Sequence, residues 1–245
     1  SCSDWAVYWK RGGQKEASMR SEDLSILRSL QHGDSCFPAG AIGMSGGLET
    51  LVDERRIDSA YAVEDFLTGQ LQCRWATMER PIVVAASRTC TDLEVLCGID
   101  AQVEAQTLAA ELRVGSVRSG RALLQVHSSL DTNNAEEFRE MIQKGRAIGH
   151  NMVVQGLVWG NVGLSEHLIE AMSAHTFCVG LLGASLRLGV IGHTNAQAVF
   201  GRLHEMISGT LKETSIPLEG VSAFSPEQEI AVMRHENSTH RLFFN

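Results

Sequence analysis

The chain has 245 residues, of which 44% are hydrophobic and 20% are charged, so it can bury a sizeable core in one large domain or two small ones. Its 21 basic and 29 acidic residues give a net charge of −8. This balance argues against nucleic-acid binding, which depends on clustered Lys and Arg.

The first twenty residues differ in character from the rest of the chain. They read "SCSDWAVYWKRGGQKEASMR", with three large aromatic residues ahead of a polar run, and they lack the charge–apolar–cleavage order of a signal peptide. We interpret residues 1–20 as a flexible extension and residues 21–245 as one folded domain. The next stretch, "EDLSILRSLQHG", has a helical pattern.

A glycine-rich stretch, "FPAGAIGMSGGLET", follows at residues 37–50. A phosphate-binding loop would end in Lys followed by Ser or Thr. This run ends instead in Leu48 and Glu49, whose carboxylate would repel phosphate. We therefore predict a tight connection between two helices, in which glycine supplies positive φ and close backbone approach.

The middle of the chain predicts helices. After Ser59 the hydrophobic residues follow the three-then-four spacing of one helical face. These positions are Val63, Phe66, Leu67, Leu71, Trp75 and Met78. Pro81 is expected to interrupt this helix, and "IVVAAS" to begin a new buried one.

Further helices are expected from residue 93 onward. Thr91 and Glu94 have the spacing of a capping box. The helical pattern after them continues through "EAQTLAAELR" to "GRALLQVH", and Gly115 and Gly120 are expected to bend or break it. Asn134, with Glu137 at its third position, predicts the start of another helix.

The last third predicts two apolar helices that meet near Gly163, with Ser165 as the cap of the second, and another helix at "TNAQAVFGRLHEMI". "SPEQ" at residues 225–228 combines a cap, a proline at the first helical position and a capping-box Gln. Strand signals are weak throughout. We therefore predict an all-α domain of roughly eight to ten helices.

Several glycines lie within or beside the apolar helices, where each costs about 1 kcal/mol relative to Ala. They are Gly156, Gly160, Gly180, Gly183 and Gly189. Closely packed helices are the preferred interpretation, and a ligand cavity is the alternative. The apolar stretch in this region, "AHTFCVGLLGASLRLGVIG", carries His175 and Arg187 and is expected to fall short of the ~20 apolar residues that a membrane span requires.

Cysteine and histidine usage predicts no preassembled metal site. Six cysteines are scattered without a C-x-x-C pair, which favours reduced thiols in the cytoplasm over a disulfide framework. Nine histidines occur without an H-x-x-x-H or H-x-H cluster.

The chain ends in "RHENSTHRLFFN", whose last residues include Leu242, Phe243 and Phe244. Burying such side chains contributes about 1.5–3 kcal/mol each, enough to hold a short tail against its own domain or another protein. Arg241 is expected to bind carbonyls or carboxylates and so fix the direction of the tail. His235 and Glu236 are adjacent and do not face each other on a helix, so a structural role is favoured over a catalytic pair.

Three blocks of the sequence together resemble the UreF family of urease accessory proteins. The first is "LQHGDSCFPAGAIGMSGGLET", the second "LRLGVIGHTNAQ" and the third "MRHENSTHRLFFN". A looser match, "ELRVGSVRSGRALL", lies between the first two. The blocks occur in the family's order, and the resemblance covers about residues 22–245.

The resemblance implies an all-α fold, a homodimer and a non-enzymatic role in nickel insertion into urease. In that family the protein binds a second accessory protein, UreD (also called UreH), and through it recruits the GTPase UreG and the urease apoprotein. Nickel and GTP are then handled by the partners, and no cofactor is bound directly. The residues expected to bind partners are Ser45, Gly47, Glu49, Arg187, Gln197, His235, Glu236, Arg241, Leu242 and Phe243.

Two other functions remain open at this point. One is a helical enzyme that uses His150, His193 or Glu49 in a cavity, although no spacing supplies a nucleophile with a base and an orienting group. The other is direct nickel carriage by His32, His193 and His235, which would depend on tertiary or dimer geometry.

Overall fold

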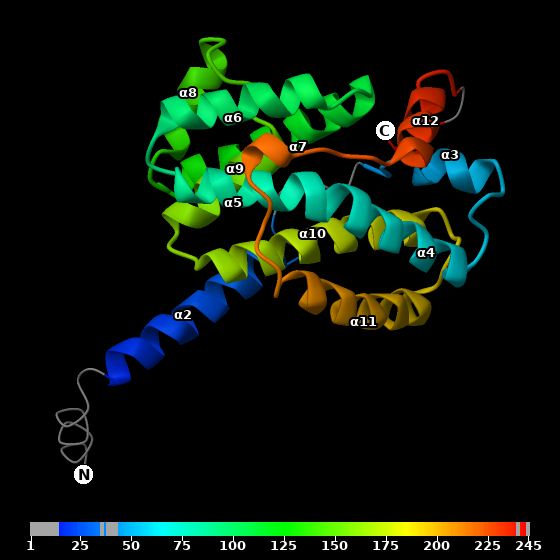
Figure 1. Ribbon diagram of the computed structural model, residues 1–245, viewed down its shortest axis with the longest axis horizontal. Coiled ribbons are helices and arrows are strands. Elements are labelled where there is room, and N and C mark those ends of the chain that lie inside the picture. The colour runs from blue at the N-terminus through cyan, green and yellow to red at the C-terminus, as the bar shows by residue number, and fades with distance from the viewer. Residues whose placement is uncertain (1–14, 35–36, 38–43, 239–240, 244–245) are drawn as a thin grey trace.

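The computed structural model describes residues 15–34, 37, 44–238 and 241–243, with the backbone alone for residues 15–21. Every regular element in these ranges is a helix, which confirms the predicted all-α fold (Figure 1). The helices are α2 (Lys15–Gly33), α3 (Leu48–Asp53), α4 (Ala60–Gln70), the π-helix η2 (Leu71–Glu79), α5 (Arg80–Arg88), α6 (Leu93–Gln106), α7 (Ala110–Ser129), α8 (Ala135–Gln143), α9 (Asn151–Asn161), α10 (Glu166–Arg187), α11 (His193–Thr210), the short 3₁₀-helix η3 (Leu218–Gly220) and α12 (Pro226–His235).

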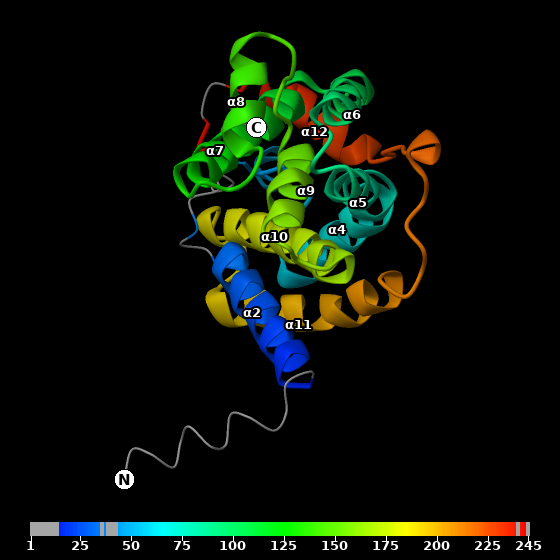
Figure 2. The same ribbon diagram turned by 90° about the vertical axis from the view of Figure 1, so that its left-hand side faces the viewer.

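Helix α9 lies at the centre of the molecule, where α5, α7 and α10 surround it (Figure 2). Its residues from Met152 to Trp159 are all buried, as expected for a helix that is hydrophobic on every side. Two hydrophobic clusters form the main core. One gathers around α5 and α9 and includes Phe138 and Trp159, and the other gathers around α3, α4, α10 and α11 and includes Trp75 and Phe200.

The chain stays helical from Ala60 to Arg88, so the prediction that Pro81 interrupts the helix is wrong. The nine residues of η2, with their wider turns, precede Pro81, which falls in the first turn of α5. Proline is tolerated in the first turn of a helix, where its missing N–H and its ring do least damage. The expected hydrophobic face and the buried "IVVAAS" segment are both confirmed.

The helix predicted to run past residue 107 is broken, but not at a glycine. Helix α6 ends at Gln106 and α7 runs unbroken through Gly115 and Gly120. The break is instead stabilised by the guanidinium of Arg113, which donates to the carbonyl oxygens of Thr107 and Leu108 at 2.6 and 2.7 Å.

The predicted helix starts are correct in position, and the caps are only partly correct. Ser165 accepts from the backbone N–H of Leu168, as expected. Asp92, not Thr91, caps α6. Asn134 precedes α8 but donates its amide to the carbonyl of Cys90.

The first turn of α12 departs from its predicted cap. Pro226 opens the helix as predicted. The side chain of Ser225 forms no capping bond, and Gln228 is buried under α3 instead of completing a capping box.

Glycine allows close backbone contact at some of the expected positions. A Cβ on Gly156 would lie 2.6 Å from the carbonyl oxygen of Val83 on α5, and a Cβ on Gly160 would lie 2.9 Å from that of Ser87. These two glycines therefore confirm the predicted close packing of α9 on α5. For Gly180, Gly183 and Gly189 no atom of another described element lies within 4 Å of such a Cβ, so close helix packing does not explain these glycines.

The end of the glycine-rich stretch forms the predicted connection into a helix. Gly46 and Gly47 have φ of 60° and 88°, a region that favours glycine, and α3 begins directly after them. A Cβ on Gly47 would lie 3.0 Å from the backbone oxygen of Gln228, so α3 packs closely on α12. Gly40 and Gly43 lie outside the described residues.

Helix α10 is long and apolar enough to cross a membrane by length and composition alone. The prediction that the apolar stretch in this region falls short of that length is therefore wrong. However, 56% of its most apolar window is buried inside the protein. The helix contributes to both large hydrophobic clusters, through Ile169 and Met172 to one and through Ala174 to Ala184 to the other. We therefore interpret α10 as a core helix.

Helix α2 projects from the body of the molecule (Figures 1 and 2) and crosses the expected boundary at residue 20. Its side facing the body is polar, and Arg28 donates to the carbonyl oxygen of Val162 at 2.7 Å. Its aliphatic side chains point outward and are more than half exposed. They are Leu24, Ile26, Leu27 and Leu30.

Candidate functional site

The end of the chain is docked on α3 through the carboxylate of Glu49. This carboxylate accepts from the backbone N–H of Leu242 at 2.6 Å and from that of Phe243 at 3.1 Å. It also receives Nε2 of His235 on α12 at 3.0 Å. Glu49 is only 5% exposed, so one buried side chain joins the first helix after the glycine stretch to the tail.

His235 lies between two carboxylates. Its Nε2 faces Glu49 and its Nδ1 faces Glu111 of α7 at 2.7 Å. Both ring nitrogens of His235 are thus engaged, and the ring is only 1% exposed. A buried polar group of this kind needs such partners, because leaving it without them would cost free energy.

Arg241 fixes the direction of the tail, as predicted. It donates to a carboxylate oxygen of Glu111 at 3.1 Å, to the carbonyl oxygen of Ser238 at 3.3 Å and to the carbonyl oxygen of Glu236. The next side chains point in opposite directions: Phe243 is buried, whereas Leu242 is 64% exposed. Of the side chains expected to hold the tail, Phe243 therefore docks on its own domain, Leu242 stays at the surface, and Phe244 lies outside the described residues.

Phe243 is held by a cation–π contact as well as by burial. The guanidinium of Arg187, at the end of α10, lies 4.3 Å from the centre of its ring. Partial burial lowers the pKa of Arg187, which nevertheless stays protonated because a guanidinium is not deprotonated in proteins. We refer to Glu49, Glu111, Arg187, His235 and residues 241–243 as the tail network.

The structure brings together most of the residues expected from the sequence. Six of them belong to the tail network: Glu49, Arg187, His235, Arg241, Leu242 and Phe243. Ser45 and Gly47 lie next to it, in the buried approach to α3. Gln197 is exposed on α11 outside the tail network, and Glu236 takes part only through its carbonyl oxygen.

Glu111 is the one member of the tail network that the sequence did not predict. It lies in the loosely matching segment "ELRVGSVRSGRALL", more than a hundred residues before His235 and Arg241, the two side chains that it contacts. The one available signal was an acidic residue in the first turn of a helix, where the helix dipole favours a negative charge. That signal does not say which histidine or arginine the carboxylate will meet.

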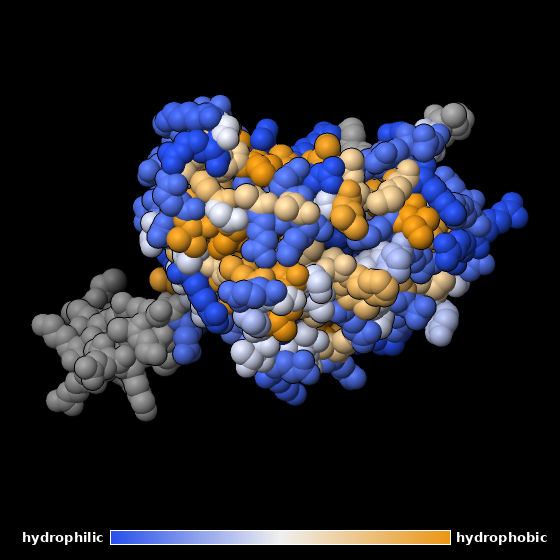
Figure 3. All heavy atoms as spheres, turned by 45° about the horizontal axis from the view of Figure 1, so that its top comes forward, coloured by the Kyte–Doolittle hydropathy of each residue, from blue (hydrophilic) through white to orange (hydrophobic). Residues whose placement is uncertain are grey.

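Exposed apolar side chains occur on the elements that carry the tail network. Val114 stands one turn after Glu111 on α7, and Ile230 and Met233 lie on α12 beside the buried Val232. Leu108, which precedes α7, and Leu242, in the tail after α12, are also exposed. Figure 3, which turns this end toward the viewer, shows hydrophobic areas interrupted by polar side chains. A non-obligate protein interface is on the whole no more apolar than other surface, so these side chains are sufficient as apolar contact area for a partner.

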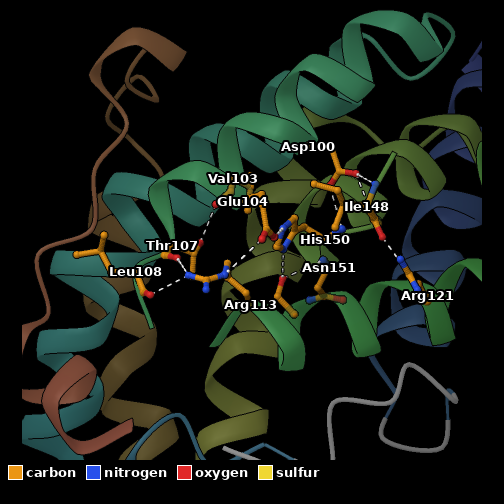
Figure 4. A network of polar contacts seen from close by, with 12 residues as sticks. Asp100, Val103, Glu104, Thr107, Leu108, Arg113, Arg121, Ile148, His150 and Asn151 are labelled. Carbon is orange, nitrogen blue, oxygen red and sulfur yellow. Dashed lines mark hydrogen bonds and ion pairs between the residues drawn. The ribbon is translucent and has the colours of Figure 1, made fainter. Parts of the chain in front are cut away.

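A second polar network, shown in Figure 4, fixes the start of α9 between α6 and α7. The carboxylate of Asp100 accepts the backbone N–H groups of Ile148, Gly149 and His150 at 2.6, 2.7 and 2.9 Å. The ring of His150 contacts Ser116 at 3.2 Å and Glu104 at 2.9 Å. The ring of His150 is fully buried, although the side chain of Glu104 is 42% exposed, so the ring holds helices together and is closed to a substrate.

Two further histidines form a buried aromatic cluster. The rings of His32 and His127 stack with centroids 5.0 Å apart, and Phe37 packs against both. Burial lowers the pKa of His127 to about 4, and the neighbouring His32 adds to this shift. Burial and the charge of Arg28 also lower the pKa of His32. Both rings are therefore neutral near pH 7.

This cluster predicts a loss of stability in acid. The unfolded chain protonates His127 at a pKa of 6.5 and the folded chain at about 4, so the unfolded state gains protons first as the pH falls through this window. Between pH 7 and pH 5 the shift should lower the free energy of unfolding by about 2 kcal/mol. Urea unfolding of the wild type and of His127→Phe at both pH values measures the difference. An equal loss in the two proteins would contradict the assignment.

The described residues include no group of three or more His, Cys, Asp or Glu side chains that could hold a metal ion. Among the three histidines considered for nickel, His32 is stacked on His127, His193 is exposed on α11, and both ring nitrogens of His235 are engaged. A surface cavity of about 370 Å³ between α7 and α8 is lined by Arg121, Leu124, Gln125, Arg139, Ile142 and Gln143. None of the residues considered for catalysis lines this cavity.

Comparison with known proteins agrees with the resemblance found in the sequence. The family model described as UreF matches residues 57–204. A urease accessory protein UreF from Trichodesmium erythraeum is 32% identical over 234 residues, which cover 92% of this chain and 97% of the relative. Relatives of the same name from Nostoc sp. and Kocuria rhizophila are 27% and 28% identical, each over 90% of this chain. The chain belongs to the UreF family of urease accessory proteins.

Proposed function

We propose that this protein is a non-enzymatic scaffold of urease maturation. It binds a UreD-type accessory protein and, through that partner, recruits the GTPase UreG to the urease apoprotein for nickel insertion in the cytoplasm. The observation that carries the proposal is the docked tail. It presents Leu242 at the surface while its neighbour Phe243 is anchored in the core.

The tail network suits a docking surface because it is preorganised. The backbone of residues 242 and 243 is held by Glu49, and Arg241 is held by Glu111, before any partner arrives. A partner therefore meets an ordered surface and does not have to order the tail itself, which strengthens binding. The exposed side chains of Val114, Ile230 and Met233 supply apolar contact area on the same elements.

The remaining partners follow from the same proposal. Nickel and GTP belong to the partner proteins, and this chain binds neither directly. The outward aliphatic side of α2, which carries Leu24, Leu27 and Leu30, supports a homodimer, because a helix face of this kind is normally covered by protein.

The two other functions find less support. Catalysis by His150 would require access that its complete burial denies, and Glu49 is occupied by three hydrogen-bond donors. Nickel carriage by His235 would require the loss of both its carboxylate partners. Among the described residues, neither function has an observation in its favour.

Deleting Arg241 to Asn245 tests the proposal. The truncated chain should lose co-purification with the UreD-type protein, because the backbone groups held by Glu49 and the exposed Leu242 are removed together. Its helical content, measured by circular dichroism, should stay near that of the wild type because no helix is shortened.

A matched control keeps the tail and removes another exposed contact. Arg88→Ala breaks an exposed ion pair with Glu166 at the start of α10, the end opposite Arg187, and should bind the partner normally. Partner binding by the truncated chain at wild-type strength would refute the proposed function.

A further inference from the structure

The segment that joins α11 to α12, residues 211–225, crosses the long helix formed by α4, η2 and α5. We refer to these residues as the strap. Figures 1 and 2 show it leaving the end of α11, rising past α5 to η3 and then running on to α12. Much of the strap lies outside helices, so its backbone groups bond to other elements or to water.

The beginning of the strap is held by Arg80. Its guanidinium donates to the carbonyl oxygen of Thr210, the last residue of α11, at 3.0 Å and to that of Glu213 at 2.6 Å. The same group is paired with Glu170 of α10 at 2.8 Å, and both side chains are buried. One arginine at the start of α5 thus joins the end of α11 to the core.

The end of the strap is held by the π-helix. The backbone N–H of Ser222 donates to the carbonyl oxygen of Thr77 at 3.1 Å, and that of Phe224 donates to the carbonyl oxygen of Cys73 at 3.0 Å. Carbonyl oxygens inside a regular α-helix are normally engaged within the helix, whereas wider π turns displace that pattern and often occur at functional sites. η2 therefore offers two acceptors, one turn apart, to a neighbouring extended chain.

Two glutamines of α6 hold the middle of the strap from its other side. Gln102 and Gln106, one turn apart, donate their amides to the carbonyl oxygens of Leu218 and Val221 at 3.0 and 3.4 Å. With Arg80 and the two carbonyl groups of η2, these bonds tie the strap and the residue before it to three anchoring elements.

The strap leads directly into α12, which carries His235. The ring of His235 lies between the carboxylates of Glu49 and Glu111, and Glu49 in turn binds the tail. Hydrogen bonds depend steeply on distance and angle, so a shift of α12 by about 1 Å would break the contacts of His235 with Glu49 and Glu111. The position of the tail therefore depends on the position of the strap.

We infer that η2 and the strap are a positioning element for the partner-binding surface: the carbonyl groups of Cys73 and Thr77 fix residues 222–224, which fix α12 and hence the tail. This inference rests on the proposed function for its consequence in binding, but its structural part can be measured separately. The residues of η2 and the strap are positioning residues and need not touch the partner.

Ser222→Pro tests the inference, with Ser222→Ala as its matched control. Proline removes the N–H that Thr77 accepts and places ring carbons against that oxygen, whereas alanine keeps the N–H. The side chain of Ser222 is exposed, and Val221 already has φ of −63° and ψ of 128°, the extended conformation that a following proline requires. The substitution is thus directed at one hydrogen bond.

The proline variant should bind the UreD-type partner at least tenfold more weakly than the wild type. Hydrogen exchange at the amides of Phe224, Leu242 and Phe243 should become at least tenfold faster. The alanine variant should stay within twofold of the wild type in both measurements.

A second variant keeps the test decisive if the proline variant does not fold. The double variant Gln102→Ala/Gln106→Ala removes the two amides that hold the middle of the strap, and it is measured in the same way. Its control is Gln143→Ala, which removes an exposed glutamine from the end of α8, away from the strap. The double variant should show the same direction of change as the proline variant, and the control should match the wild type.

Two results would overturn the inference. One is faster exchange at Phe224 with unchanged exchange at Leu242 and Phe243. The other is normal partner binding by the proline variant when deletion of residues 241–245 abolishes binding. Binding that survives this deletion would refute the proposed function instead, and the exchange rates alone would then decide whether the strap positions the tail.

Discussion

Gly120→Ala should lower the free energy of unfolding by about 3 kcal/mol or more, because the added methyl group has no space. A Cβ on Gly120 would lie 2.8 Å from the backbone nitrogen of Asn151 and the carbonyl carbon of His150, and closer still to the backbone oxygen of Gly149. These are backbone atoms at the start of α9, which Asp100 holds in place. Neither side can yield without breaking that network.

Helix propensity alone predicts the opposite sign for this substitution. Alanine is favoured over glycine in a helix by about 1 kcal/mol, and Gly120 lies inside the unbroken helix α7. Gly201→Ala on α11 isolates this effect, since, apart from the neighbouring backbone of α11 itself, no atom of the described residues would lie within 4 Å of the added Cβ. The control should therefore be neutral or stabilising in urea unfolding. A Gly120→Ala protein as stable as this control would contradict the close contact.

Glu49→Ala should lower the free energy of unfolding by about 3–5 kcal/mol, the range observed when one partner of a buried ion pair is removed. The substitution removes one of the two carboxylates that contact the ring of His235 and leaves two backbone N–H groups of the tail without their acceptor. The tail should then detach, and limited proteolysis should remove it before the body of the protein is cleaved. Urea unfolding and mass spectrometry measure the two effects.

Glu227→Ala is the matched control for Glu49→Ala. Glu227 forms an ion pair with Arg56 at 2.5 Å, but both side chains are about half exposed, so its removal should cost less than about 1 kcal/mol. Glu49→Gln should fall between the two, because it keeps one acceptor oxygen for the tail. Equal stability of the Glu49→Ala and Glu227→Ala proteins would show that the tail network contributes nothing.

Local patterns in the sequence were sufficient for the all-α class, for several helix starts and for the anchored tail. Hydrophobic spacing predicted the helical face from Val63 to Met78, and caps and proline placed the starts of α10 and α12 closely. These features depend on residues a few positions apart. The tail could be predicted because a chain end with two adjacent Phe residues and an Arg is unusual.

Features that depend on distant parts of the chain were missed or predicted wrongly. Glu111 lies 124 residues from His235, and nothing in its neighbourhood identifies that partner. The break between α6 and α7 depends on Arg113 reaching back to two carbonyl groups, and the segment itself carries no breaker residue. The π-helix has no sequence signature, so Pro81 was read as an interruption.

The path of the helix from Ala60 to Arg88 has a consequence for how the protein unfolds. This helix supplies Trp75 to one large hydrophobic cluster and Ile82 and Val83 to the other, and α10 spans both clusters in the same way. Neither hydrophobic cluster can unfold without disrupting a helix that also packs in the other cluster. The body should therefore behave as a single cooperative unit, and damage at either end lowers the melting temperature of the whole.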